Sequence, residues 1–220
     1  MKRGSAMARN KHPEVTVKRI IKSAEKLFLE KGYEDTTIQD IVDDLGDLSK
    51  GAIYHHFKSK EEIIDAVSTE LYADVNFDDY VKDQPNGLAK LQKLAMLCVG
   101  DTKQRDLLAS APSLMKNPRM LVKGLDEIKN ESAPMIMPYI EEGIRDGSIK
   151  TTHPRQAAEV FLILANIWVS PLVYSVEKEV YIEKILMFKE IFEGIGMPVV
   201  TDEMVEALKK YYRIAETYKK

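Results

Sequence analysis

The sequence predicts an all-α fold, with a small three-helix unit at the N-terminus and a larger helical bundle after it. Three observations lead to this prediction. Apolar residues recur at helical spacing in both parts of the chain. Cap residues and glycines divide the first 60 residues into short helices. The apolar content of 45 % is ordinary for a globular protein, and 220 residues leave room for one large or two small domains.

The first helix is predicted from an apolar stripe and a stop signal. The members of the stripe are Ile20, Ala24, Leu27 and Phe28. The helix should end near Lys31 and Gly32. Its apolar face requires a partner, which the next helices supply.

The second helix is predicted from Thr37 to about Leu45. Its buried face is formed by Ile38, Ile41, Val42 and Leu45, at i, i+3, i+4 and i+7. Thr37 and Asp40 have the spacing of a capping box, in which each side chain satisfies a backbone donor at the helix start. Gly46 then supplies a left-handed stop.

A third helix is predicted to begin after Ser49, whose hydroxyl can accept from the backbone two or three residues on. Ile53 and Phe57, four apart, can face inward. The residues that then face outward are Lys50, Gly51, Tyr54 and His55. This mixture is poor for a solvated face, because glycine weakens a helix and an exposed tyrosine is costly. Close approach of another surface explains it better.

The charge around this third helix is positive. Residues 49–60 contain three lysines, two histidines and no acid, although the whole chain has a formal charge of −3. Phosphate is therefore the natural partner. A further capping box, Ser59 with Glu62, precedes an apolar stripe formed by Ile63, Ile64, Val67 and Leu71. A helix beginning at Lys60 would direct its first amides and the Lys60 ammonium at the same anion.

Three helices around one small core, with the third exposed, is the architecture of a helix-turn-helix domain. Residues 20–64 also resemble the DNA-binding domain of the TetR family of bacterial transcriptional regulators. The resemblance rests on the pattern AxxLFxxxGYxxTTxxxIxxxLG followed by LSKGAIYHHFKSKEE, and it covers about the first third of the chain. One feature departs from it. Asp47 and Leu48 both stand between Gly46 and Ser49, where family members usually have one residue.

The resemblance implies a set of DNA-contacting residues. Phosphates would be held by Thr37, Tyr54 and Lys60, and the major groove would be approached by Lys50, Gly51, Ala52 and His55, with His56 at its edge and Ser49 as the cap. The chemistry agrees, since phosphate contacts position a protein and base-edge contacts carry its sequence preference. Lys50 could donate to guanine O6 or N7, and Ala52 could meet a thymine methyl. The additional turn residue would tilt or shift the third helix and bring an anion near its surface.

Other interpretations of these residues stay open. Lysines beside capped helices commonly form a solvated face, and Tyr54 could be packed. His55 and His56 are poor joint metal ligands, because adjacent helical residues diverge by about 100°. For an enzyme, the candidate catalytic residues would be Cys98, His153 or scattered carboxylates. No motif, however, places a nucleophile, a base and an orienting group together. We therefore expect no catalytic residues, no metal and no cofactor.

The charge divides unevenly along the chain. Residues 1–60 hold 12 basic against 9 acidic residues, a charge of +3, and residues 61–220 have a charge of −6. A positive N-terminal part and a negative remainder would orient a protein on DNA. The predicted organisation is a tag or flexible arm at 1–13, a helix-turn-helix domain at 14–60, and a helical domain for effector binding and dimerisation at 61–220.

The compartment expected from the sequence is the cytoplasm. One cysteine excludes an intramolecular disulfide, and no apolar run approaches the ~20 residues that cross a membrane. The N-terminal segment lacks the hydrophobic core of a secretory signal. We interpret residues 1–6 as the remnant of an expression tag, with Met7 the natural start. Arg9 and Lys11 could still touch DNA as a loose arm.

Further helices are predicted at residues 88–98, 107–115, 119–143, 154–174 and 181–195. Pro134 and Pro138 should bend or interrupt the third of these, because proline removes a backbone donor. Such kinks open space between helices, and methionine suits an adaptable binding surface. The sequence suggests an effector cavity lined by some of Met96, Met115, Met135, Tyr139, Asn166 and Trp168, although simple core packing remains an alternative for each.

The last two of these helices carry more apolar surface than one domain can easily hide, which indicates association. The resemblance implies that such a pair builds a four-helix interface in a homodimer. Two recognition helices about 34 Å apart would then read a palindromic operator. The resemblance further implies repression that a small molecule relieves. Binding of this molecule would tilt the helix over 60–73. The alternative is a helical ligand-binding or scaffold protein that does not bind DNA.

Overall fold

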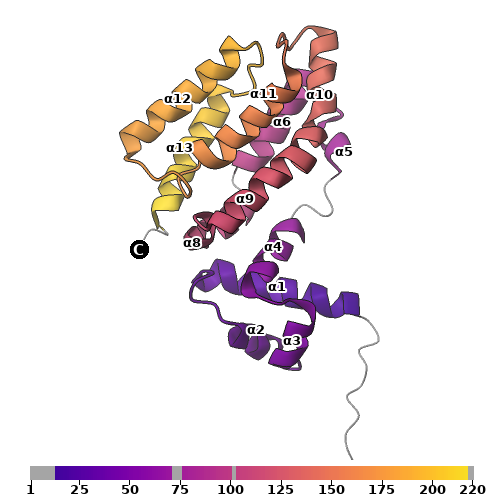
Figure 1. Ribbon diagram of the computed structural model, residues 1–220, viewed down its shortest axis with the longest axis vertical. Helices are drawn as coiled ribbons and strands as arrows, with labels where there is room; N and C mark the ends of the chain where they lie inside the picture. Colours follow the sequence, from indigo (N-terminus) through magenta and orange to yellow (C-terminus); the bar gives the residue numbers. More distant parts are fainter. Residues whose placement is uncertain (1–12, 71–75, 101–102, 218–220) are drawn as a thin grey trace, which may run out of the picture. The chain divides into compact units, whose positions relative to one another are not determined.

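The computed structural model describes residues 13–70, 76–100 and 103–217, and every regular element in these ranges is a helix (Figure 1). The all-α prediction is confirmed. The chain divides into two compact units, Met1–Ala73 and Asp74–Lys220. The suspected tag remnant, the arm with Arg9 and Lys11, and the end of the helix predicted over 60–73 lie outside the described residues. Within the described helices, none is both long and apolar enough to cross a bilayer.

The first unit is built from four helices: α1 (Pro13–Lys31), α2 (Ile38–Leu45), α3 (Lys50–His56) and α4 (Lys60–Glu70). Its largest fully buried side chains come from all four, namely Ile20, Phe28, Ile41, Ile53 and Ile63. Helix α4 packs along α1 and buries Ile64 and Val67 as well. The unit therefore includes α4, whereas the boundary predicted at residue 60 assigned this helix to the second domain.

The second unit is larger and more irregular. Its α-helices are α5 (Phe77–Val81), α6 (Gly87–Val99), α7 (Lys103–Ala109), α8 (Pro112–Met115), α9 (Pro118–Glu127), α10 (Ala133–Asp146), α11 (Pro154–Ile163), α12 (Lys178–Gly194) and α13 (Asp202–Thr217). Two π-helical turns, η1 (Ile128–Ser132) and η2 (Leu164–Trp168), continue α9 and α11. Such turns occur often at functional sites.

The structure differs from the predicted helices in identifiable ways. The helix predicted over 107–115 is divided, because Pro112 begins a new helix at α8. Helix α10 continues through Pro138, and the irregularity falls instead on η1, directly before Pro134. The helix predicted over 154–174 ends with η2, so Tyr174 lies in the following loop. The short α5 and the long α13 were not predicted.

Aromatic packing and one close helix crossing organise the core of the second unit. Phe161 of α11 stacks on Phe188 of α12 with ring centroids 5.5 Å apart, and Phe192 contacts both edge-on. Helix α6 crosses α10 so closely at Gly87 that a Cβ atom there would lie 2.1 Å from the backbone nitrogen of Gly143. Only glycine fits at this crossing.

Candidate nucleic-acid interface

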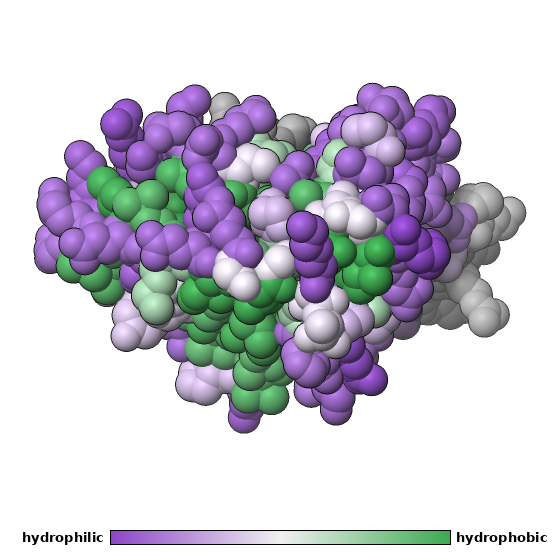
Figure 2. All heavy atoms as spheres, turned by 90° about the horizontal axis from the view of Figure 1, so that it is seen from above, coloured by the Kyte–Doolittle hydropathy of each residue, from purple (hydrophilic) through white to green (hydrophobic). Residues whose placement is uncertain are grey.

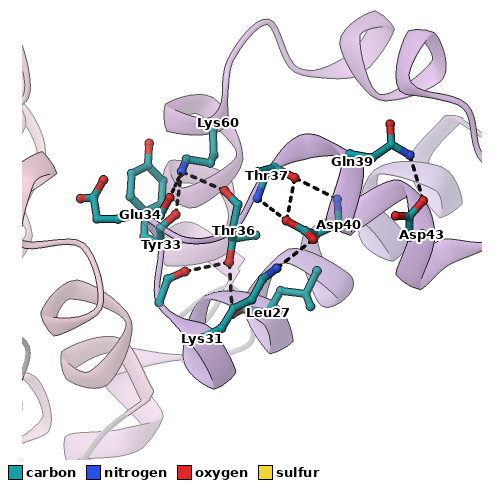
Figure 3. Close-up of polar contacts among 11 residues, drawn as sticks. Leu27, Lys31, Tyr33, Glu34, Thr36, Thr37, Gln39, Asp40, Asp43 and Lys60 are labelled. Carbon is teal, nitrogen blue, oxygen red and sulfur yellow. Dashed lines mark hydrogen bonds and ion pairs between the residues drawn. The ribbon is translucent and has the colours of Figure 1, made fainter.

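The start of α2 is fixed by the capping box that the sequence predicted. The Thr37 hydroxyl accepts from the backbone N–H of Asp40 and donates to the Asp40 carboxylate at 2.6 Å. The carboxylate also accepts from the Thr37 backbone and from Lys31 at 2.9 Å (Figure 3). The Thr37 hydroxyl already donates its proton to the Asp40 carboxylate. A phosphate at this position would therefore have to compete with Asp40 for that hydrogen bond.

Helix α3 presents the surface that the sequence predicted. The Ser49 hydroxyl accepts from the backbone of Ala52 and caps the helix. Ile53 is fully buried, and Phe57 is buried at the C-terminal cap. The side that faces solvent comprises Lys50, Gly51, Tyr54 and His55, with Ala52 and His56 half-buried beside them. A Cβ atom on Gly51 would meet only the Ser49 hydroxyl, so the helix surface is open there.

The turn between α2 and α3 accommodates its additional residue through an ion pair. Gly46 ends α2 in the left-handed region, at φ 74°. Asp47 then turns back toward α1, where Arg19 donates to both of its carboxylate oxygens, one of them at 3.0 Å. This pairing lowers the pKa of Asp47, mainly through the hydrogen bond from Arg19. The anion that the additional residue introduces is thus neutralised within the unit.

Lys60 has internal partners. Its ammonium donates to the backbone carbonyls of Tyr33 at 2.6 Å and Thr36 at 2.9 Å, with a longer contact to Glu34 at 3.3 Å (Figure 3). The same nitrogen lies 4.1 Å from the centroid of the Tyr33 ring. All three ammonium protons are engaged by the segment that joins α1 to α2. The side chain therefore ties α4 to this segment, where the sequence led us to expect a phosphate contact.

Acidic side chains of α2 are likewise held by neighbouring residues. Asp44 accepts from Ser23 and from Lys26, each at 2.7 Å, and these bonds lower its pKa, the one from Lys26 most. The pKa of Asp40 is also lowered, chiefly by the hydrogen bond from the Thr37 hydroxyl. Because both carboxylates are tied to α1 or to the helix start, the positive field of residues 49–60 has few free anions beside it.

Comparison with known proteins supports this description of the first unit. The model of bacterial regulatory proteins of the tetR family matches residues 20–67, which run from α1 into α4. The HTH-type transcriptional repressor KstR2 of Rhodococcus jostii is 32 % identical over 145 residues, covering 63 % of this chain and 70 % of the relative. The chain belongs to the TetR family.

Solved structures extend the likeness to most of the chain. A transcriptional regulator from Cytophaga hutchinsonii superposes with a TM-score of 0.58 at 19 % identity, covering 93 % of this chain and 97 % of that one. RolR, whose structure is described in complex with the ligand resorcinol, gives a TM-score of 0.55 at 18 % identity over 91 % and 96 % of the two chains. At these identities the likeness shows that the second unit also has a TetR-family fold.

The six predicted effector residues of this TetR-family chain lie in different environments of the second unit. Met96 and Trp168 pack at the edge of the main core, whereas Tyr139 belongs to a separate cluster with Val81 and Leu94. Its hydroxyl donates to Asp78 at 2.6 Å, and burial, followed by this contact, raises its pKa to about 12. These residues therefore face at least two regions of the second unit.

The other three effector candidates are also dispersed. Met115 packs on a third cluster with Leu172 and Ala215. Met135 is 43 % exposed. Asn166 is exposed, and its amide donates to the Leu162 carbonyl at 2.8 Å. The spacing of the methionines alone could not distinguish these environments, because methionine serves both in cores and at binding surfaces.

Two residues that the sequence analysis did not single out have notable environments. Arg19 lies on the solvent side of α1, and only the departure at Asp47 could have indicated its partner. Lys184 lies on the buried face of α12, with Tyr181 and Ile185 as neighbours. Its spacing within the apolar stripe of α12 was the available signal, since a lysine at a core position is uncommon.

Proposed function

We propose that this TetR-family protein is a transcriptional repressor that binds a palindromic operator as a homodimer and leaves it when a small molecule binds the second unit. The observation that carries the proposal is the exposed, acid-free surface of α3 on a scaffold whose inner side is fully buried. The naming of the KstR2 relative as a repressor supports the direction of regulation. No enzymatic role is assigned to the chain.

The proposed division of roles follows the geometry of α3. Lys50, Gly51, Ala52 and His55 approach the major groove, where base edges carry sequence information. Tyr54, which is 46 % exposed, holds a phosphate through its hydroxyl. His56 lies at the edge of this surface. Thr37 and Ser49 contribute mainly by fixing the starts of α2 and α3, and the Lys60 side chain is left out of the DNA contacts.

Two substitutions on α3, one that removes a charge and one that removes a hydroxyl, test this proposal directly. An operator is first selected from random duplexes, and binding is then measured by fluorescence anisotropy at several salt concentrations. Lys50→Ala should weaken binding by about 1–3 kcal/mol and relax the base preference at one position of each half-site. Tyr54→Phe should weaken binding to all sequences alike, because a phosphate contact carries no base information.

Lys209→Ala is the matched control, since it removes one charge from α13 in the other unit. Its affinity and salt dependence should equal those of the unsubstituted protein. If the selection yields no operator, or if binding does not weaken with salt, the chain is a helical ligand-binding or scaffold protein and the proposal is wrong.

The proposed dimer contact uses the exposed apolar side chains of α11 and α12. In the view of Figure 2, hydrophobic residues form one larger group and several smaller ones among the hydrophilic residues. Among the exposed hydrophobic residues of the second unit are Val160 and Ile163 on α11 and Leu186 and Met187 on α12, the last 53 % exposed. Exposed apolar side chains mark an interaction site where they form a contiguous patch. In this family a four-helix contact between two subunits would cover it.

A double substitution, Ile163→Lys with Met187→Lys, is expected to weaken self-association by at least about tenfold. The reason is that each subunit would bury two unpaired ammonium groups, and about 1.4 kcal/mol suffices for a tenfold change. Sedimentation equilibrium measures the change. The control is Leu125→Lys, at a 40 % exposed leucine of α9, which should leave the dimer intact. A dimer that resists the double substitution would place the contact elsewhere.

Release by an effector requires only a modest coupling energy. A coupling of roughly 1–3 kcal/mol changes affinity by about 5 to 150-fold. The effector must bind the released conformer more tightly than the DNA-bound one, because equal affinity for both shifts nothing. We propose that the released conformer differs in the spacing of the two α3 helices of the dimer. RolR, which shares this fold, is described with a small aromatic ligand.

A further inference from the structure

The ammonium group of Lys184 is unusual among the described residues. Lys184 is 7 % exposed, on the side of α12 that also buries Tyr181 and Ile185. Its Nζ atom is fully buried, and among the residues that the structure describes it finds no hydrogen-bond partner. A buried cation normally has a carboxylate or several carbonyl oxygens around it, because its lost hydration must be replaced.

Two aromatic rings surround this ammonium. The centroid of the Tyr174 ring lies 3.9 Å from Nζ, and that of the Trp168 ring lies 5.0 Å away. Ring faces attract a cation, but they accept none of its three protons in a hydrogen bond of ordinary strength. Burial correspondingly lowers the pKa of Lys184. The rings therefore replace only part of the hydration that the ammonium has lost.

The two rings come from different segments. Trp168 ends the π-helical turn η2, where the backbone of Val169 donates to the Leu164 carbonyl at 2.7 Å. Tyr174 lies in the loop between η2 and α12 and is 53 % exposed. An outward movement of the Tyr174 side chain would uncover the Lys184 ammonium.

We propose that Lys184 anchors the carboxylate of a small hydrophobic acid, and that this acid is the effector class of the second unit. The carboxylate would accept hydrogen bonds from the ammonium, whose protons have no acceptor among the described residues. A hydrogen bond between two ionised groups is stronger than one between neutral groups. Trp168, with Tyr174 displaced outward, would contact the apolar body of the acid. The inference rests on the proposed function for its regulatory meaning, but the anchoring itself does not depend on DNA binding.

The test compares 3-phenylpropionate with its neutral amide, 3-phenylpropanamide, on the full-length protein without DNA. Binding is followed by Trp168 fluorescence, because Trp168 is the single tryptophan of the chain, and by isothermal titration calorimetry. The carboxylate should bind at least about tenfold more tightly than the amide, as expected for loss of one charge-assisted contact. Lys184→Met, which keeps the length of the side chain without its charge, should abolish this preference.

Lys189→Met is the matched control on the same helix, where the lysine already pairs with Asp202 at 2.6 Å. It should bind the carboxylate as the unsubstituted protein does. Lys184→Met should also melt no lower than the unsubstituted protein, because it removes an unpaired buried charge. A lower melting temperature would mean that the ammonium serves the packing of the two rings.

Three results would overturn the inference: equal affinity for acid and amide, unchanged carboxylate binding by Lys184→Met, or no binding of either probe at millimolar concentration. A dimer that dissociates in Lys184→Met while no probe binds would show instead that the lysine pairs across the subunit contact. Loss of operator binding with intact carboxylate binding would overturn the proposed function alone, so the two failures can be told apart.

Discussion

Replacing Lys60 with methionine is expected to lower the free energy of unfolding of the first unit by about 2–3 kcal/mol, because carbonyls that now accept from a cation would lose their donor. The carbonyls belong to Tyr33, Glu34 and Thr36, so the connection between α1 and α2 should loosen together with the start of α4. Hydrogen exchange, read peptide by peptide over α1 and α4, would measure the loss. Operator affinity should fall as a consequence of this loosening.

Lys58→Met is the control for Lys60→Met, since Lys58 is exposed and only two residues away. It should change stability by no more than about 0.5 kcal/mol, as is usual for a surface substitution. If Lys58 contacts phosphate, its loss should also make the salt dependence of DNA binding shallower by about one counterion per half-site. Lys60→Met should leave that slope unchanged at temperatures where the unit stays folded. A stable Lys60→Met protein with a shallower slope would mean that the ammonium does contact phosphate.

Replacing Gly87 with alanine is expected to destabilise the second unit by about 3 kcal/mol or more, which is the upper range for overpacking a core. The added Cβ would lie 2.1 Å from the Gly143 nitrogen and 2.3 Å from the Tyr139 carbonyl oxygen. Both are backbone atoms of α10, so a change of side-chain rotamer cannot relieve the contact. Thermal unfolding followed by Trp168 fluorescence would report the loss, because Trp168 packs against the core of this unit.

The control for this substitution is Gly124→Ala in α9. A Cβ atom there would have no neighbour within 4 Å, so the change should stabilise the helix by up to about 1 kcal/mol. The two substitutions add the same methyl group to two helical glycines and should act in opposite directions. Equal melting temperatures for both would mean that α6 and α10 do not cross as closely as the structure describes.

The first unit could be predicted well because its information is local. Thr37, Gly46 and Ser49 each fix a helix end through contacts within four residues, and all three have the predicted geometry. The Lys60 ammonium could not be placed in the same way. Its acceptors are backbone carbonyls 24 to 27 residues earlier in the chain, and the sequence contains no signal for a carbonyl.

The second unit was harder to predict because its sites depend on long-range packing. Helix α13 has an N-cap in Thr201, which accepts from Met204, and a buried stripe that includes Leu208 and Tyr212, so local signals for it existed. For Lys184, the spacing could indicate a lysine at a core position but not the two rings around it. Trp168 and Tyr174 reach it only because α11 continues as a π-helical turn and the following loop folds back on α12.

The bidentate pair of Arg19 and Asp47 matters for anyone who exchanges recognition helices among relatives. Asp47 occupies the additional position of the turn, and its partner lies 28 residues earlier, outside any segment that a graft of residues 46–56 would carry. A chimera that imports the turn without arginine at position 19 leaves a free anion beside the surface that we propose reads DNA. A graft that transfers DNA specificity together with this turn therefore has to include both Arg19 and Asp47.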